Sequence, residues 1–342
     1  MTRSMWVWLH RWVGLTIAGF LVIVGLTGSL LAFWLEINHW LTPELYPGER
    51  PGVTLYVATL VQRAEMIVPK ARVGNVYFGY PGTVMIGMEP ADGARKLDFE
   101  FLHLDPVDGH ERGRVTWSGL PRHGVDIMPF VYALHMYLAM ADVGQWILGS
   151  VALLWTIDCF VAFYLTLPPR VEHGRKDFLA RWKTAWMIKF RGSFYRINID
   201  VHRAGGLWLW PILFIFAWSG VSLLFPNVYA GVTRVFFDYA SDSHMAYRAQ
   251  TTEAAAPMGW ASAQEVGRKL MAAKAKEKGF KIDRLVALYQ LDDKRAYEYR
   301  VHSSLDIGEK GGETSVTFDS QTGEPLRFKL LTDAHSGDTM AC

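Results

Sequence analysis

Four histidines occupy matching positions in the two halves of this sequence. A shift of 192 positions, made without a gap, places His10 on His202, and His135 in the first half corresponds to His335 in the second. A single histidine near the end of an apolar segment is usually an interfacial polar residue. Two equivalent histidines are different, because a pseudo-twofold axis between repeats brings them face to face. Neutral imidazoles on facing helices can bind a haem iron from both sides, so the pairing predicts bis-histidine haem sites.

The residues that follow His10 and His202 also repeat. The same shift places Arg11 on Arg203 and Gly14 on Gly206. A glycine four residues after each histidine shares its helix face, and it leaves room either for a porphyrin or for a closely packed helix. The arginines suit haem propionates through charge-assisted pairing, and anchoring of the cytoplasmic helix ends explains them as well. A repeat of this length indicates two copies of a larger unit, and duplicated membrane units commonly hold a site between their halves.

Two further groups of polar residues could do chemistry. Asp158 is the one acidic residue within a predicted membrane span, so we consider it for a proton relay, or as a protonated carboxyl bonded to a neighbour. The second group has the composition of a metal site and comprises His103, Asp105, Asp108, His110 and Glu111. The equivalent segment Asp319–Gly323 contains no histidine, which favours an ordinary turn over a metal site at both places.

The composition indicates membrane spans joined by soluble portions. Of 342 residues 51% are hydrophobic, and the mean hydropathy is +0.10. A net charge of +2 gives no support for nucleic-acid binding. The two cysteines, Cys159 and Cys342, form no disulfide framework and have no metal-ligand spacing. Redox chemistry in this chain would therefore need a cofactor.

The elements that position the histidines follow from the apolar runs. The uncharged run from Trp12 to Leu35 would form a helix of about 36 Å, enough to cross about 30 Å of hydrocarbon. Phe130–Leu167 and Ala204–Thr233 are predicted as the second and third spans, the latter tolerating Pro211 within it. A fourth span is expected to begin at His335, although the chain ends before completing it. The predicted segments are span 1 in 1–39, a soluble module in 40–128, span 2 in 129–169, a basic loop in 170–200, span 3 in 201–233, a second module in 234–333 and the start of span 4 in 334–342.

The two soluble modules have the same predicted order, one helix packed against a small antiparallel sheet. In the first, Thr54 caps a helix that extends to Ile67, and in the second the helix is Trp260–Lys278. The basic loop should be cytoplasmic by the positive-inside rule, which places the N-terminus inside and both modules outside. The predicted strands are 72–77, 83–88 and 97–104, then 284–289, 296–301 and 314–318, and the predicted turns are 105–109 and 319–323.

This order of elements and its motifs resemble the PepSY-associated transmembrane family over nearly the whole chain. Within the family the chain looks most like the inner-membrane siderophore reductases. That likeness implies a membrane α-helical protein with periplasmic α+β PepSY-like modules, and two b-type haems that pass electrons outward to ferric hydroxamate siderophores. The motif residues are His10-Arg11-Trp12-Val13-Gly14-Leu15, Thr27-Gly28, His202-Arg203-Ala204-Gly205-Gly206-Leu207, Ser219-Gly220 and Asp333-Ala334-His335-Ser336-Gly337-Asp338.

Two functions are therefore weighed. In the first, the protein is a haem-dependent ferric-siderophore reductase of the bacterial inner membrane, with an inner haem at His10 and His202 and an outer haem at His135 and His335. Its partners are a ferric siderophore, membrane lipid and an electron donor that the residues do not identify, and the chelate is expected in a space bounded by the two modules. In the second, inert helices anchor PepSY-like modules that bind or regulate a periplasmic peptidase.

Overall fold

The computed structural model describes residues 2–48, 51–91, 93–117, 119–169, 178–237, 256–291, 295–306, 308 and 312–330. The chain divides into two compact units. One, the helical unit, contains residues 1–29 and 134–232, and the other, the sheet unit, contains residues 30–133 and 233–342. His335, the expected start of a fourth span and part of the basic loop (170–177) lie outside the described residues.

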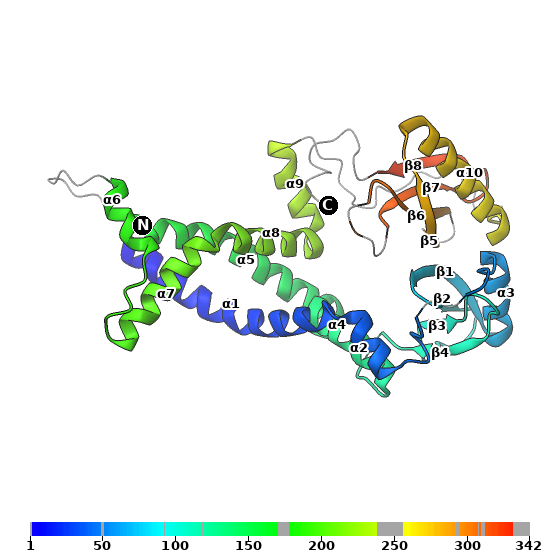
Figure 1. Cartoon of the computed structure of the whole chain (residues 1–342), viewed down its shortest axis with the longest axis horizontal. Coiled ribbons are helices and arrows are strands. Elements are labelled where there is room, and N and C mark those ends of the chain that lie inside the picture. The colour runs from blue at the N-terminus through cyan, green and yellow to red at the C-terminus, as the bar shows by residue number, and fades with distance from the viewer. Residues whose placement is uncertain are drawn as a thin grey trace. The chain divides into compact units, whose positions relative to one another are not determined.

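Two helices are long and apolar enough to cross a membrane, within the part of the chain that the structure describes (Figure 1). They are α1 (Arg3–Leu31) and α5 (Ala141–Thr166). α1 ends four residues before the predicted limit at Leu35, because the chain turns at 32–33 and continues as the short helix α2 (Trp34–Leu41). The first predicted span therefore corresponds to α1, a candidate membrane helix that is shorter than predicted.

The second predicted span is not one continuous helix, as the run Phe130–Leu167 had suggested. It divides into α4 (Ile127–Tyr137) and α5. Leu138 and Ala139 in the break, and Ala141 at the first position of α5, have positive φ. A Cβ atom on Gly144 would overlap the backbone of Tyr137. The close approach of α5 to the end of α4 therefore requires a glycine at position 144. His135 consequently belongs to α4 and not to the spanning helix α5.

The third predicted span is also interrupted. It consists of α7 (Phe194–Trp208) and α8 (Trp210–Leu224), which meet at an angle of 69° and are followed by α9 (Pro226–Phe236). Pro211 occupies the first turn of α8, where its missing N–H has no intrahelical acceptor to lose. The proline therefore begins a new helix instead of being absorbed within one. Before α7, the described part of the basic loop forms two short helices, α6 (Phe178–Trp182) and η2 (Lys183–Trp186).

The sheet unit contains both predicted soluble modules. Each has one longer helix and four strands, one strand more than predicted. α3 and α10 contact each other and share one buried apolar core with the strands, so they cover the same face of the sheet (Figure 1). The first module comprises α3 (Val57–Ile67), β1 (Ala71–Tyr80), β2 (Thr83–Pro90), β3 (Phe101–Leu104), β4 (Glu111–Val115) and the turn η1 (Gly124–Asp126), and the second comprises α10 (Trp260–Lys278), β5 (Ile282–Leu291), β6 (Ala296–Ser303), β7 (Thr314–Asp319) and β8 (Pro325–Lys329).

The two sets of strands form a single antiparallel sheet, where the sequence predicted two separate ones. The strand order is β4-β3-β2-β1-β5-β6-β7-β8, so the modules join at β1 and β5. Both of these strands have ten residues, yet they pair only from Asn75 opposite Tyr289 to Tyr77 opposite Ala287. Residues 78–80 of β1 and residues 282–286 of β5 therefore do not pair with each other.

The start of α3 differs from the prediction. Tyr56 and not Thr54 is the N-cap residue, and its side chain accepts no capping hydrogen bond. The backbone N–H of Val57 instead donates to Oε1 of Gln264 on α10, at 3.2 Å. A free N–H in the first turn of a helix needs an acceptor, and here the other module supplies it. No local signal could reveal a partner 207 residues away.

The two predicted turns are confirmed, and they are built in the same way. Asp105 Oδ1 accepts hydrogen bonds from the backbone N–H groups of Val107 and Asp108. Asp319 Oδ1 likewise accepts from the backbone of the second and third residues after it, at 2.9 Å each. Gly109 and Gly323 end the turns with φ of +74° and +75°. Aspartate supplies a side-chain acceptor for the backbone N–H groups, and glycine adopts the positive φ. Both residue types are visible in the sequence, so the turns could be predicted from it.

Candidate functional site

The helical unit encloses a cavity of about 660 Å³ between α1, α5, α7 and α8. That volume lies within the range of about 300–1,000 Å³ that is typical of small-molecule and cofactor sites. Its wall is predominantly apolar, with a few polar groups contributed by three of the helices. The lining residues include His10, Gly14, Leu21, Trp155, Asp158, Phe163, His202, Arg203, Gly206 and Trp210.

The cavity brings together the first predicted histidine pair. The ring centres of His10 on α1 and His202 on α7 lie 6.1 Å apart, and the ring planes are inclined by 38°. An imidazole nitrogen binds a metal ion at about 2 Å, so two imidazoles on opposite sides of one ion have ring centres roughly 6 Å apart. The separation is therefore compatible with one iron between these two rings.

Asp158 fixes the orientation of His10. Both carboxylate oxygens lie 3.0 Å from Nδ1 of His10, and Asp158 is buried, with 8% of its surface exposed. When Asp158 is ionised and His10 is neutral, Nδ1 donates its proton to the carboxylate and Nε2 keeps a lone pair. Ligand histidines in metal sites characteristically donate their second ring nitrogen to such a partner. The sequence singled out Asp158 but gave no sign of its pairing with a histidine 148 positions away.

The two predicted glycines line open space. Among the described residues, no atom of a neighbouring helix lies within 4 Å of a Cβ placed on Gly14 or Gly206. Close helix packing therefore does not explain these glycines in this structure. Since both residues also line the cavity, their missing side chains enlarge the space beside His10 and His202. This observation favours a flat ligand over a helix contact.

The two predicted arginines have different surroundings. Arg203 lines the cavity, and one guanidinium nitrogen donates to buried Asp200 at 2.8 Å and to the Thr184 carbonyl at 3.0 Å. Its Nε is buried without a hydrogen-bond partner among the described residues, so it can still donate to an anionic group. Arg11 is exposed and does not line the cavity. Of the two arginines predicted to pair with haem propionates, Arg203 lines the cavity and Arg11 does not.

His135 lies beside a second cavity in the same unit. Its Nδ1 is 3.1 Å from the carbonyl oxygen of Val24 and 3.0 Å from the hydroxyl of Thr27. Because a carbonyl can only accept, Nδ1 carries the proton and Nε2 is free to act as a ligand. Gly28 permits this approach, since a Cβ there would lie 3.0 Å from the His135 ring. The second cavity measures about 110 Å³, below the range of about 300–1,000 Å³ that is typical of cofactor sites, and the predicted partner His335 lies outside the described residues.

The acidic turn of the first module has the spacing of a metal site. Ligand atoms of Asp105, Asp108 and His110 lie within 4.8 Å of one another, but these groups already have partners. Asp105 is fully buried and pairs with Arg112, while Asp108 pairs with His110 at 2.6 Å. Burial alone would raise the pKa of Asp105, but the turn's backbone N–H groups and the Arg112 guanidinium together lower it. These contacts support the predicted structural turn.

His103 from the same predicted group is buried away from the turn. Its Nδ1 lies 3.2 Å from the hydroxyl of Thr83, and burial lowers the pKa of His103 to about 4. Glu111 pairs with Arg114 at 2.7 Å. His103 and Glu111 therefore do not complete a metal site with the carboxylates of the turn.

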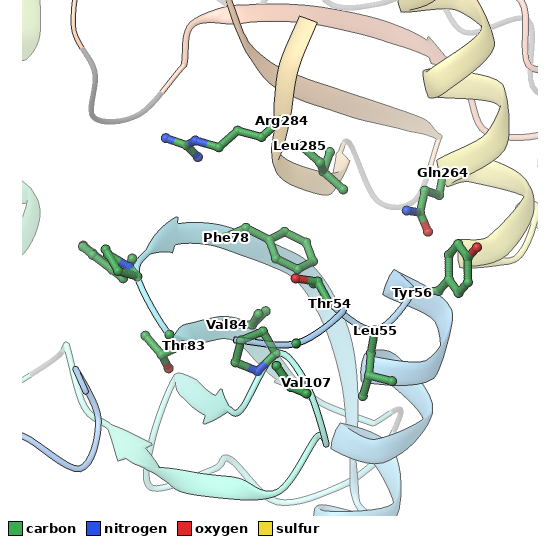
Figure 2. A pocket seen from close by; sticks show the side chains of 15 residues that line it. Thr54, Leu55, Tyr56, Phe78, Thr83, Val84, Val107, Gln264, Arg284 and Leu285 are labelled. Atoms are coloured by element: carbon green, nitrogen blue, oxygen red, sulfur yellow. The ribbon is translucent and has the colours of Figure 1, made fainter. Parts of the chain in front are cut away.

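The sheet unit contains a pocket of about 460 Å³ where β1 and β5 separate. Residues of both modules line it, including Phe78 on β1, Gln264 on α10 and Leu285 on β5. Figure 2 shows Leu285 directed toward Phe78 across the opening, and Gln264 near Tyr56. The pocket thus combines apolar walls with amide and hydroxyl groups. A space for the chelate between the two modules was predicted from the sequence, but none of these lining residues was.

The family model described as the PepSY-associated TM region matches residues 7–340 of the 342-residue chain. No curated protein matches the sequence.

Proposed function

The chain belongs to the PepSY-associated transmembrane family and is a membrane protein, and from this premise we propose that it is a di-haem electron carrier that reduces ferric siderophores. In the proposal, His10 and His202 hold an inner b-type haem, and His135 and His335 hold an outer one. Electrons leave toward the periplasmic side, where a hydroxamate-bound iron(III) accepts them.

The observation that supports the proposal most strongly is the arrangement of His10, His202 and Asp158. Two imidazoles 6.1 Å apart face a cavity of about 660 Å³, and one of them is oriented by a buried carboxylate. A bound haem would supply an iron that gains and loses one electron. The protein's own part is to hold both ring nitrogens, keep the site apolar and leave a donor on Arg203 for a propionate.

The proposed substrate is supported by coordination chemistry. Hydroxamate oxygens are hard ligands that bind iron(III) more strongly than the softer iron(II), so one-electron reduction weakens the chelate and releases iron. The pocket between β1 and β5 is our candidate site for the chelate. Its apolar walls suit the methylene chains of a hydroxamate siderophore, and Gln264 and Arg284 carry N–H groups that can donate to its oxygens.

An absorption spectrum is the direct test of the proposal. Purified full-length protein is expected to be red, with a Soret band that sharpens and shifts when dithionite is added. Two haems per chain, determined chemically, would complete the expected result. A colourless protein that still folds in its membrane would contradict the proposal and would favour peptidase binding by the sheet unit.

Asp158→Asn should weaken haem binding at the inner site by about 10- to 100-fold, as loss of the carboxylate that hydrogen-bonds a ligand histidine typically does. Asparagine has nearly the same size but cannot accept the Nδ1 proton with a full negative charge. Titration of the haem-free protein with haem measures the change, and Asp142→Asn at the start of the same helix is the control. Equal affinities in the wild type and Asp158→Asn would show that the carboxylate does not support the ligand.

The proposed orientation can be tested with a membrane-impermeant thiol reagent. Ser193→Cys and Ser262→Cys would be made separately, with Cys159 and Cys342 replaced by serine. The reagent should label position 262 in intact spheroplasts, whereas position 193 should react only after permeabilisation, because the basic segment before it is retained in the cytoplasm. The reverse pattern would place the sheet unit in the cytoplasm.

A further inference from the structure

Basic and aromatic residues occur together in the segment that leads from α5 into α7. From residue 178 to residue 199 the chain has five basic residues and no acidic one. Phe190 and Tyr195 are each 75% exposed, and Phe194 is 85% exposed. Large apolar side chains gathered on an exposed, charged segment mark an interaction surface. The central part of the segment is Lys189-Phe190-Arg191-Gly192-Ser193-Phe194-Tyr195-Arg196.

The segment packs against the end of a candidate membrane helix. Trp182 on α6 donates its indole N–H to the Thr166 hydroxyl at 3.2 Å and packs on Phe163, both in the last turn of α5. Arg3 donates to the Leu165 carbonyl at 2.6 Å, so α1 begins at the same level, and Figure 1 shows α6 beside the start of α1. Because α1 and α5 are long and apolar enough to cross a membrane, their shared end lies near the edge of the hydrocarbon.

Asp200 closes part of the segment into a loop. This carboxylate is fully buried, and its Oδ2 accepts from the backbone N–H of Lys189 at 3.3 Å and from Nε of Arg196 at 3.4 Å. Its Oδ1 accepts from Arg203 at 2.8 Å. One buried charge therefore ties both ends of the loop 189–196 to α7. The exposed aromatic side chains of this loop are consequently held on a fixed base.

Three cations of the segment remain for a partner outside the chain. Arg196 and Arg203 share the carboxylate of Asp200. Lys183, Lys189 and Arg191 are exposed and have no acidic partner within the part of the chain that the structure describes. Near an anionic membrane surface, each such cation strengthens binding by about fivefold. The segment thus offers unpaired positive charge and exposed aromatic rings at the edge of a membrane.

We propose that residues 187–199 form an in-plane membrane anchor that binds anionic phospholipids. Phe190, Phe194 and Tyr195 would enter the headgroup region, and Lys189 and Arg191 would pair with lipid phosphates. The anchor goes beyond the proposed electron transfer and does not depend on it. Retention of positive charge in the cytoplasm requires neither exposed aromatic rings nor a loop closed by a buried carboxylate.

Lipid fits this surface better than an acidic soluble protein does. Such a protein would satisfy the unpaired cations, but it would have to cover rings that lie beside the end of α5. The headgroup region already adjoins that end of the helix, and it supplies both phosphate groups and an apolar boundary. One occupant therefore accounts for the charges and for the rings.

The first experiment measures lipid binding to the full-length protein. Protein in a mild detergent is titrated with phosphatidylglycerol or with phosphatidylcholine, and bound lipid is counted by native mass spectrometry. The charge variant combines Lys189→Gln and Arg191→Gln. Its matched control combines Lys276→Gln and Lys278→Gln, which remove two exposed cations from the end of α10 in the sheet unit.

The charge variant should bind phosphatidylglycerol about 25-fold more weakly, about fivefold for each charge removed, while its phosphatidylcholine binding stays unchanged. The control should equal the wild type with both lipids. A ring variant, Phe190→Ser with Phe194→Ser, should bind both lipids more weakly. Equal binding of the two lipids by the wild type would overturn the inference, as would equal phosphatidylglycerol binding by the wild type and the charge variant.

The second experiment separates lipid from a protein partner. A nitroxide label is attached at Gly192→Cys, with Cys159 and Cys342 replaced by serine, and its depth in phosphatidylglycerol vesicles is measured by power-saturation EPR. The label should report the headgroup region. A label fully in water would exclude membrane insertion and would point to a soluble acidic partner. A protein without haem would refute the proposed function and leave both of these results unchanged.

Discussion

Replacing His10 or His202 by alanine is expected to remove about half of the haem from a protein that binds two, because each change deletes an axial ligand of the same inner site. The two rings lie 6.1 Å apart beside one cavity, so an iron held between them would lose one of its two protein ligands in either variant. Haem per chain, determined by the pyridine haemochrome method, measures the effect. The remaining haem should keep the spectrum of the outer site.

The combined variant provides a sharper version of this experiment. The proposal assigns His10 and His202 to one site, so removing both histidines should cost no more haem than removing one. His110→Ala is the control, since His110 lies in the exposed turn of the sheet unit and pairs only locally with Asp108. Full haem content in both single variants would exclude this pair as ligands. A further loss in the combined variant would show that the two histidines belong to different sites.

The elements that the sequence predicted well are those with local signals. Trp260–Lys278 forms α10 at the predicted bounds, and the turns at Asp105 and Asp319 form through side-chain acceptors and glycines of positive φ. Each of these features depends on residues within a few positions of one another. Periodicity and turn chemistry are sufficient to identify such features.

The features that the sequence did not reveal depend on distant residues or on unusual backbone. The pairing of β1 with β5 joins Asn75 to Tyr289, and no local pattern specifies it. The break before α5 places Leu138 and Ala139 at positive φ, which neither residue type prefers. Pro211 was visible, but whether a proline bends a helix or begins a new one depends on the packing around it.

In the candidate site, too, features with a signal in the sequence were predicted, and contacts between distant residues were not. Equivalent positions in the repeat identified His10 and His202, and the structure brings these rings together. Asp158 stood out as a lone carboxylate in an apolar run, but its contact with His10 required the packing of α1 against α5.

His135→Ala should slow the oxidation of chemically reduced protein by a ferric hydroxamate far more than His10→Ala does. Nδ1 of His135 donates to the Val24 carbonyl, so Nε2 would be the atom that holds the proposed outer iron. Gly28, which contacts His135, lies about 27 Å along α1 from the level of His10. A protein without the outer haem would have to pass electrons from the inner site over most of the bilayer's hydrocarbon thickness of about 30 Å.

Stopped-flow absorption at the Soret band measures this reoxidation, with each variant fully reduced before mixing. The initial rate of haem oxidation should be near the wild-type value in His10→Ala, because the outer haem is retained and already reduced. In His135→Ala the remaining inner haem should stay reduced long after the wild type is oxidised. Since a ferric siderophore is polar and large, it cannot enter the apolar region to meet the inner haem directly. Equal rates in the wild type and His135→Ala would therefore exclude the outer haem as the point from which electrons leave the protein.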